Sequence, residues 1–358
     1  MDKYLVALIH LPKMTPTRLR RLLANWSPEA LWKIESNDWL TAGIEADFAK
    51  EATAARAKID PDKILANLEK IGARLIFEKD ADFPEQLKDI YSAPAWLFVR
   101  GNFKPAEQKF FTVVGPRKIS SYGKQVTEEI VRELASKGLT IVSGLAIGVD
   151  TEAHRATLAV GGCTVAVLGC GIDQIYPAQN HNLAQEILEK GGAIISEYKP
   201  GTEPLRQNFP ARNRIVSGLS QGVLITEASE KSGSLITATM AVEQGREVFA
   251  IPGSIFSQNS AGTNQLIKSG QAQAITSAQD ILDALDIKDL SSFRETQCVK
   301  MNNPKEQVVF DLLGKEPVHI DEITKQSQLK TNEVAVAISL LEMRGIIRDV
   351  GGQNYIRK

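Results

Sequence analysis

Residues 110–144 read FFTVVGPRKISSYGKQVTEEIVRELASKGLTIVSG and contain one complete strand–helix–strand pattern. A β-branched apolar run (110–114) ends at a glycine, a helical pattern covers residues 122–137, and a second apolar run ends at Ser143. Strands that are apolar along their whole length are typical of a parallel sheet with helices on both faces. We therefore expect this stretch to form one unit of such a sheet.

The same alternation continues to about residue 285. The later apolar runs are TVAVLG, AIISE, GVLITEA and EVFAIPG, and the helical patterns between the runs begin near Val149, Asn182, Arg212 and Ser234. Repeated alternation of this kind predicts an α/β fold with a doubly wound parallel sheet. Ligands of such sheets bind beyond the carboxyl ends of the strands.

Residues 1–72 predict an all-helical N-terminal domain. Two of its helical patterns open with a capping residue followed by a proline, at Thr15–Pro16 and Ser27–Pro28. The segment LPKMTPTRLRRLL (11–23) is similar to one half of a helix-hairpin-helix, but it lacks the glycines that let backbone amides approach a phosphate. The domain is therefore either a DNA-binding hairpin or a small docking domain.

The central domain is assigned to residues 73–285, and its first part (73–103) is an extended connector that adds an edge element to the sheet. Residues 286–303 are polar and without a clear period, which indicates a linker. Residues 304–358 predict three helices and a hairpin that turns at Gly351–Gly352, which together describe a winged helix.

The composition is that of an ordinary globular chain with no bulk charge. Of 358 residues, 43% are apolar and 24% are charged, and the formal net charge is -1. No apolar run of about 18 residues or more occurs, so we expect no membrane span. The three cysteines match neither a disulfide framework nor a zinc pattern, which favours a cytoplasmic location. Any nucleic-acid site must be a local patch.

Glycine-rich elements follow four strands of the central domain, at residues 115–123, 143–150, 168–173 and 227–238. Glycine lets the backbone approach a ligand, and a helix that starts there offers free amides to an anion such as phosphate. Packing of a tight turn is the alternative explanation for any single one of these glycines. The sequence contains neither a full dinucleotide fingerprint nor a P-loop, and we predict no cofactor.

Positive charge gathers after two of the strands. Arg117 and Lys118 follow the first strand of the domain. The segment 199–218, KPGTEPLRQNFPARNRIVSG, has one acid and four basic residues: Lys199, Arg206, Arg212 and Arg214. We expect its last two arginines and Asn213 to lie at the start of a helix.

The side chains of segment 199–218 suit an unpaired nucleic-acid strand. Arginines fork onto phosphate oxygens, the Asn213 amide can donate a hydrogen bond, and the Phe209 ring can stack on a base of any sequence. The alternative is that the arginines are buried structural partners of nearby carboxylates, either Glu197 or Glu227.

No catalytic residue and no metal site are predicted. The four histidines lack metal-ligand spacing, and His154 is expected to cap a helix or pack in the core. Ser143 and Ser234 are not part of a GxSxG elbow. Glu197 and Glu227 both follow strands and could act as paired carboxylates in glycoside chemistry, but we favour them as partners of the arginines.

Several of these motifs, taken in order, resemble those of the DNA-processing protein A family, DprA, also called Smf. The motifs are GPRKISSYG, SGLAIGVDTEAH, VAVLGCGIDQIYP, FPARNRIVSGLSQGVLITEASEKSGSLITA and GREVFAIPG, and the match covers almost all of residues 75–285. The outer domains are similar to those of members with an N-terminal sterile-alpha-like domain and a C-terminal winged helix. The resemblance implies an extended Rossmann-like core.

It also implies a non-enzymatic protein that binds single-stranded DNA without regard to sequence. Such a protein protects incoming DNA in natural transformation, loads the RecA recombinase onto it and forms a homodimer. By motif, the DNA-binding residues would be Arg117 with its neighbour Lys118, Ser143, Gly144, Phe209, Arg212, Asn213, Arg214, Ser232, Gly233 and Ser234. The family's GSR reads GPR here, so Pro116 removes an amide donor and a hydroxyl, and we expect a weakened phosphate contact.

The helical region after GREVFAIPG supplies a candidate surface for the second subunit and for RecA. Its apolar residues are Leu266, Ile267, Ile275, Ile281 and Leu282. Ordinary core packing is the alternative for each of them.

The winged helix is a poor candidate for reading duplex DNA. Its third helix has no Lys or Arg before Arg344, whereas a helix in the major groove needs donors for bases and phosphates. We favour a protein-contact or regulatory role for this domain.

Two other functions compete with DNA binding by the central domain. One is an enzyme of a related Rossmann-like class, a nucleotide phosphoribohydrolase, although its PGGxGTxxE signature is missing at SEKSGSLITA (229–238). The other is a protein adaptor whose end domains do the main work.

Overall fold

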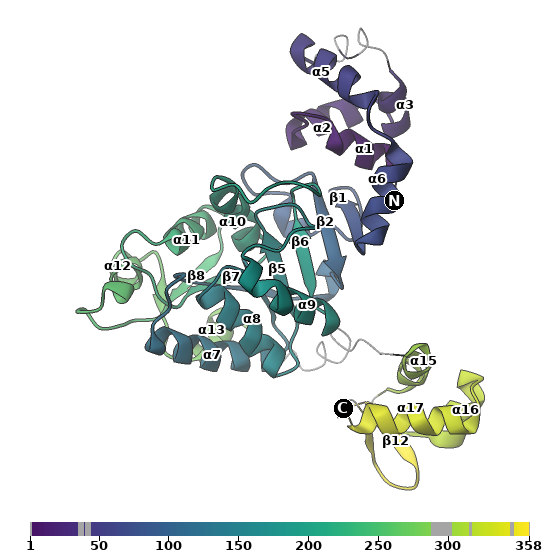
Figure 1. The fold of residues 1–358 in the computed structure, drawn as a ribbon. Helices are drawn as coiled ribbons and strands as arrows, with labels where there is room; N and C mark the ends of the chain where they lie inside the picture. The colour runs from purple at the N-terminus through teal and green to yellow at the C-terminus, as the bar shows by residue number, and fades with distance from the viewer. Residues whose placement is uncertain are drawn as a thin grey trace. The chain divides into compact units, whose positions relative to one another are not determined.

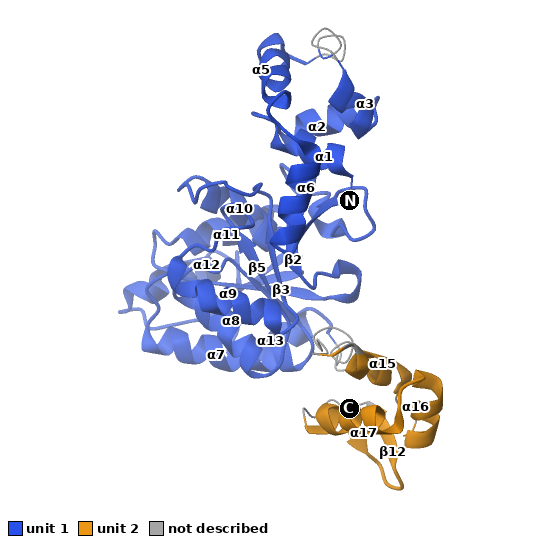
Figure 2. Cartoon of the chain, turned by 45° about the vertical axis from the view of Figure 1, so that its right-hand side comes forward, with its two compact units in different colours: residues 1–288 blue, residues 289–358 orange. Residues whose placement is uncertain are grey.

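The computed structural model describes residues 2–34, 39, 44–287, 303–314, 317–343 and 347–357. The chain divides into two compact units, Met1–Lys288 and Asp289–Lys358, which are coloured blue and orange in Figure 2. The predicted linker, 286–303, lies almost entirely outside the described residues. Within the described part of the chain, no helix is both long enough and apolar enough to cross a membrane.

The N-terminal residues are helical, as predicted. Side chains cap two helices at the predicted places, since Thr15 accepts from the Arg18 amide at 3.2 Å and Ser27 accepts from the Ala30 amide at 3.2 Å. The likeness to a sterile-alpha domain stays a prediction. The helices are α1 Lys3–His10, α2 Pro16–Leu23, α3 Pro28–Lys33, α5 Ala46–Arg56 and α6 Pro61–Lys70.

A nine-stranded sheet forms the centre of the first unit, with the order β1-β2-β6-β5-β4-β3-β7-β8-β9. Strands β3 to β9 pair in parallel, while β2 runs antiparallel to β6 and β1 antiparallel to β2. The connector therefore adds two edge strands. The strands are β1 Ala73–Phe77, β2 Trp96–Gly101, β3 Phe110–Val114, β4 Thr140–Ser143, β5 Thr164–Leu168, β6 Ala193–Ser196, β7 Gly222–Ile225, β8 Glu247–Ala250 and β9 Gln273–Ala274.

Helices cover both faces of this sheet, which confirms the doubly wound α/β prediction (Figure 1). One layer holds α7 Ser121–Ser136, α8 Val149–Ala159, α9 His181–Glu189 and α13 Ala278–Ala284. The other layer holds α10 Asn208–Gly218, α11 Gly233–Glu243 and α12 Ala261–Lys268. The chain leaves β3 toward β4 on one side and reaches β7 on the other, so the strand order reverses beside β3.

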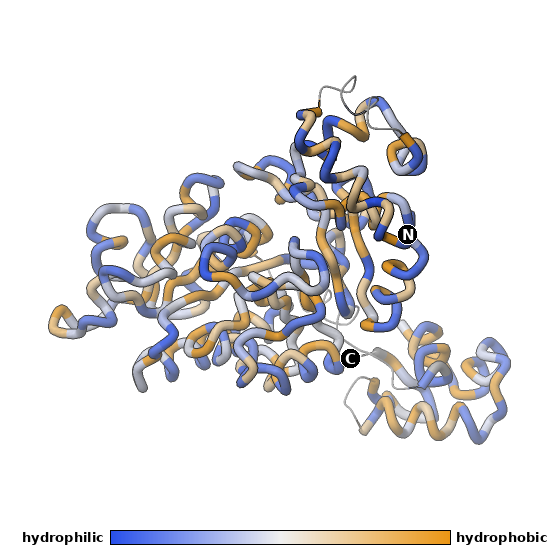
Figure 3. Tube along the Cα trace, turned by 45° about the horizontal axis from the view of Figure 1, so that its top comes forward, coloured by the Kyte–Doolittle hydropathy of each residue, from blue (hydrophilic) through white to orange (hydrophobic). Residues whose placement is uncertain are grey.

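The core of this unit is made by the strands, which are the apolar segments at the centre of Figure 3. One hydrophobic cluster joins the sheet to α10 and α11. A second cluster joins the other face to α9 and to the N-terminal helices, and it includes Leu8, Leu19 and Phe98. The N-terminal helices and the sheet therefore share buried apolar surface.

The second unit is a winged helix, as predicted. It contains α15 Pro304–Leu312, α16 Ile320–Ser327, α17 Thr331–Met343 and a three-stranded sheet of order β10-β12-β11. The strands are β10 Val318–His319, β11 Ile347–Asp349 and β12 Asn354–Arg357. The predicted core stripe of the third helix is buried, and its members are Val334, Ala337, Ile338 and Leu341.

Replacing Phe98 with alanine will test the shared core. Phe98 is fully buried on β2, and the His10 ring of α1 meets its edge at a centroid distance of 6.3 Å. Because the substitution leaves a cavity between the sheet and the helices, we expect a loss of about 3–5 kcal/mol in the free energy of unfolding, measured in urea. Tyr91→Ala, at a side chain that is 92% exposed, is the control and should leave the midpoint unchanged.

Candidate nucleic-acid interface

The loops after β3, β4, β5, β6 and β7 lie at one edge of the sheet, because these strands are parallel and their carboxyl ends point the same way. Binding sites of doubly wound sheets lie where the strand order reverses, which here is the space beyond the ends of β3 and β7. All four predicted glycine-rich elements end up at this edge.

The loop after β4 binds an anion, but the anion belongs to the protein. Asp150 of α8 accepts hydrogen bonds from the amides of Gly144 at 3.1 Å and Ala146 at 3.2 Å. Gly148 closes the turn at φ 87°, and a Cβ there would lie 2.3 Å from the carbonyl oxygen of Pro116. These two amides are therefore already satisfied and are not offered to a phosphate.

A second internal carboxylate fills the start of α7. Glu227, which follows β7, accepts from the amide of Ser120 at 3.0 Å and from its hydroxyl. Gly123 makes room for it, since a Cβ at that position would lie 2.3 Å from Glu227 Oε2. The predicted pairing of Glu227 with an arginine is not what the structure shows, because this carboxylate caps a helix instead.

Arg212 points into the protein. It is 5% exposed, and its Nη1 donates to the carbonyl of Gly144 at 2.8 Å and to that of Val167. Burial lowers the pKa of Arg212, and the nearby Asp150 carboxylate acts in the opposite direction. The prediction that residues 212–214 start a helix is wrong, because α10 begins at Asn208 and places them in its second turn.

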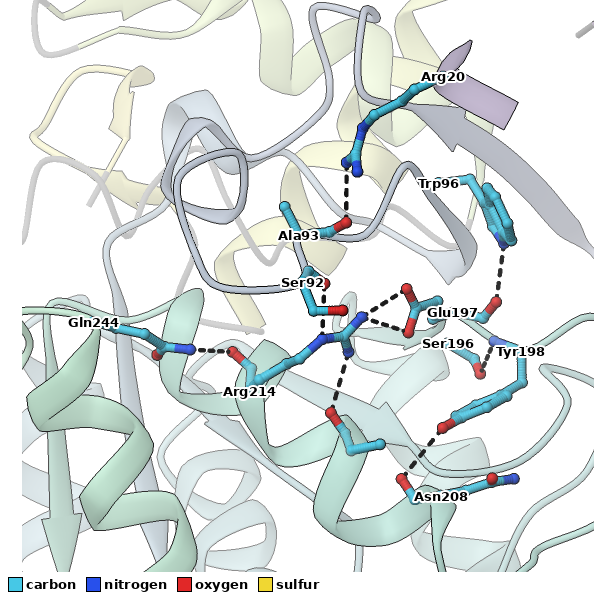
Figure 4. Close-up of polar contacts among 11 residues, drawn as sticks. Arg20, Ser92, Ala93, Trp96, Ser196, Glu197, Tyr198, Asn208, Arg214 and Gln244 are labelled. Carbon is cyan, nitrogen blue, oxygen red and sulfur yellow. Dashed lines mark hydrogen bonds and ion pairs between the residues drawn. The ribbon is translucent and has the colours of Figure 1, made fainter. Parts of the chain in front are cut away.

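Arg214 has a complete set of protein partners (Figure 4). Its Nη2 donates to both carboxylate oxygens of Glu197, at 2.7 and 2.8 Å. Its Nε donates to the carbonyl of Ser92 at 3.0 Å and its Nη1 to that of Ala211 at 3.1 Å. The structure thus shows the ion-pair alternative for Arg214, and this arginine ties α10 to the segment before β2.

Three side chains lie together at this edge, and we call Arg117, Tyr176 and Phe209 the aromatic platform; the first two are exposed and Phe209 is half-buried. The Arg117 guanidinium lies over the Phe209 ring, 5.8 Å from its centroid, and the Tyr176 and Phe209 rings are 5.5 Å apart at 38°. Gly169 permits this arrangement, since a Cβ there would lie 2.9 Å from the Phe209 ring. Sequence reasoning missed Tyr176, which is 43% exposed and lies three residues after the end of the third glycine-rich element.

Arg117 and Lys118 are both exposed, and in the described part of the chain neither forms an ion pair with a carboxylate. Arg206 and Lys231, at the ends of nearby loops, are exposed in the same way. The unpaired positive charge at this edge therefore comes from the loops, while Arg212 and Arg214 of α10 bond to groups of the protein itself.

The other predicted site residues divide between surface and interior. Ser232 and Gly233 lie at the start of α11, where Ser232 Oγ accepts from the Ser234 amide at 3.4 Å. Ser143 is fully buried and its hydroxyl donates to the Val113 carbonyl at 2.7 Å. Asn213 accepts from Arg212 Nε at 3.3 Å. Direct contact with DNA stays a prediction for this set.

The predicted partner surface after β8 is wrong for most of its residues. Leu266, Ile281 and Leu282 are 7%, 0% and 4% exposed, because their helices turn these side chains toward the sheet. Ile267 is partly buried against the same core, and Ile275 is 1% exposed. Core packing, the alternative left open by the sequence, is what the structure shows.

His154 packs inside the protein, as expected. It is fully buried on α8, and its Nδ1 lies 2.7 Å from the hydroxyl of Thr164. Burial, helped by the Arg212 charge, lowers the pKa of His154 to about 3. Within the described residues, no group of three His, Cys, Asp or Glu side chains is placed to hold a metal ion.

Fold and site together define a Rossmann-like protein with an exposed aromatic and cationic surface beyond its strands and a separate winged helix. Comparison with known proteins supplies the family. Residues 74–286 match the model of DNA recombination-mediator protein A, and residues 301–353 match the DprA winged helix domain. The chain belongs to the DprA/Smf family, which confirms the resemblance seen in its motifs.

Its relatives cover most of the chain. DNA processing protein DprA of Bacillus subtilis is 39% identical over 284 residues, which are 76% of this chain and 94% of the relative. The X-ray structure of DprA from Streptococcus pneumoniae has a TM-score of 0.67 at 36% identity and covers 79% of this chain and 98% of its own. A structure of DprA from Helicobacter pylori, described for its single-stranded DNA binding mode, has a TM-score of 0.54 at 34% identity, with 60% and 95% covered.

The buried histidine predicts how stability depends on pH. Between about pH 6.5 and pH 3 the unfolded chain protonates His154 while the folded chain does not, so the unfolded state binds more protons and stability falls with falling pH. This one group contributes a slope of up to about 1.4 kcal/mol per pH unit, and His10, whose pKa burial also lowers, adds in the same direction. Urea titrations from pH 7 to pH 4 should be flatter for His154→Gln; an equally steep profile contradicts the assignment.

Proposed function

We propose that this chain binds single-stranded DNA, irrespective of sequence, at the aromatic platform of Arg117, Tyr176 and Phe209. The observation that carries the proposal is an exposed, unpaired guanidinium held over the half-buried Phe209 ring, with the exposed Tyr176 ring beside it, at the sheet edge where doubly wound folds bind ligands. The Helicobacter pylori relative, whose structure concerns single-stranded DNA binding, supports single-stranded DNA as the ligand.

The chemistry of the platform fits a flexible strand better than a duplex. A guanidinium makes paired hydrogen bonds to phosphate oxygens, and an aromatic face stacks on any base, worth about 1–3 kcal/mol per base. Lys118, Arg206 and Lys231 add charge for neighbouring phosphates. Because few charges take part, affinity per subunit is modest and falls with salt.

We propose a binding protein, not an enzyme. A phosphoribohydrolase would need free loop amides for its phosphate, but the loop after β4 and the start of α7 hold the carboxylates of Asp150 and Glu227. Incubation with nucleoside monophosphates, followed by chromatography, should release no free base. Release of base by the wild type, lost in Glu227→Gln, would support the enzyme instead.

From the family resemblance we further infer the biological role. The chain would protect DNA taken up in natural transformation and load the RecA recombinase onto it in the cytoplasm. A direct measurement is RecA filament formation on oligo-dT coated with a single-strand binding protein, with and without this chain. An unchanged filament rate would count against loading while leaving DNA binding intact.

We also propose a homodimer, formed through the loop before α12 and not through the buried residues of α12 and α13. Ile255 is 84% exposed and Phe256 is 92% exposed, side by side in the sequence. Hydrogen bonds hold this loop. Ser257 N donates to Ser254 O at 3.0 Å, and the Asn264 side chain accepts from the Gly253 amide and donates to the Gly253 carbonyl. Exposed adjacent apolar anchors on an ordered loop are typical of an interface.

Arg117→Ala should weaken binding to oligo-dT about tenfold, because it removes the unpaired guanidinium of the platform. The slope of log affinity against log salt should become less steep by roughly 0.7, the value for one phosphate on a single strand. Fluorescence anisotropy at several salt concentrations measures both. Arg132→Ala on α7, an exposed arginine paired with Glu128 at 2.8 Å, is the matched control. Equal losses of affinity for the two variants would show that the platform is not part of the binding site.

Phe256→Glu should convert a dimer to a monomer in sedimentation velocity, because an isologous contact places the new charge beside its own copy. Binding to an oligonucleotide long enough for two subunits should then weaken by up to ~100-fold through lost avidity, while short oligonucleotides bind as before. Tyr91→Glu, at an equally exposed aromatic, is the control. A variant that still sediments as a dimer contradicts this interface.

A further inference from the structure

The third helix of the winged helix, α17, is apolar on two opposite faces. Its core stripe is buried, but Val336 is 60% exposed, Met343 is 84% exposed and Leu340 is half-buried between them. These three residues are spaced i, i+4 and i+7, so they form one straight row on the face opposite the core. We call Val336, Leu340 and Met343 the outer stripe.

The charge beside the outer stripe is negative. The described residues of α17 include two carboxylates, Glu333 and Glu342, and no lysine or arginine. Glu333 is bound by Lys305 at 2.6 Å, whereas Glu342 is exposed and no cation pairs with it in the described part of this unit. An apolar row edged by carboxylates repels phosphates, so this helix is not suited to enter a DNA groove.

A hollow of about 220 Å³ lies between α15 and α17, and two residues of the outer stripe, Val336 and Leu340, line it. Its floor is made by Val336, Ala337 and Leu340, and its rim includes Asn332 and Lys305. An amphipathic helix docks on an apolar row of this kind through its own side chains at i, i+3 or i+4 and i+7, and a hollow beside the row can receive one of them.

We propose that the outer stripe binds an amphipathic helix of a partner protein, one whose apolar row is flanked by lysine or arginine. Charge complementarity selects this occupant over a second copy. Two copies of α17 packed along their stripes would each bring the unpaired Glu342 carboxylate to a helix with no lysine or arginine among its described residues, which disfavours self-association. This inference is independent of DNA binding by the central domain.

The test uses a fluorescent synthetic helix of roughly 15 residues with leucines at i, i+4, i+7 and i+11 and lysines on both flanks. Its twin carries glutamates in place of the lysines. With the full chain, the lysine peptide should bind and the glutamate peptide should not. Val336→Glu should weaken the lysine peptide at least about tenfold, while Val242→Glu, at another exposed valine on α11 (47% against 60% exposed), should not.

Glu342→Lys supplies the charge-reversal arm. It should weaken the lysine peptide and strengthen the glutamate twin, a crossover that loss of folding cannot produce. Equal binding of the lysine peptide to wild type and Val336→Glu overturns the proposal. Two further measurements then identify the true occupant of the stripe. A lower sedimenting mass for Val336→Glu identifies a second copy, and a lower affinity for duplex DNA identifies a groove reader.

Discussion

The buried guanidinium of Arg212 is the contact on which the sheet edge depends. It bridges the carbonyl of Gly144 after β4 and that of Val167 in β5, with the Asp150 carboxylate close by. A charge removed from water is tolerated only when hydrogen bonds and an opposite charge compensate it. Gly144 is required here, since a Cβ would lie 2.6 Å from Arg212 Nη2 and 2.8 Å from Asp150 Oδ2. The loop, the helix and the strand end are thereby locked together.

This internal neutralisation decides what the surface can offer. Asp150 and Glu227 accept hydrogen bonds from amides that would otherwise attract a phosphate, and Glu197 forms an ion pair with Arg214. The unpaired cations in the described part of this edge sit on loops, and one of them, Arg117, lies over an aromatic ring. Such a surface suits the proposed contacts to a nucleic-acid backbone and to the faces of bases better than it suits an enclosed nucleotide. Weak contacts of this kind gain strength by repetition along a strand, which is why a second subunit matters for the proposed function.

The sequence predicted the elements well because apolar period and glycine placement are local signals. It predicted Arg117 and Phe209 as neighbours in function, and the structure places one over the other. It could not separate Arg117 from Arg212 and Arg214, because which arginine turns inward depends on where α10 begins and on carboxylates far away in the chain. Tyr176 carried no signal of its own. The apolar residues near Leu266 and Leu282 could not be assigned to core or interface from the sequence, because an amphipathic helix has the same apolar period in either place.

Pro116 affects how the backbone holds Arg117 in place. Proline there lacks the amide that a serine would offer, so one donor to a phosphate is absent. Its carbonyl, however, accepts from the Val149 amide at 3.3 Å and packs against Gly148, whose φ of 87° suits glycine. With its φ fixed by the ring and its carbonyl held by α8, residue 116 holds the backbone that carries Arg117. In the proposed complex, the hydrogen bond that a serine amide would donate is therefore offset in part by a smaller loss of conformational entropy on binding.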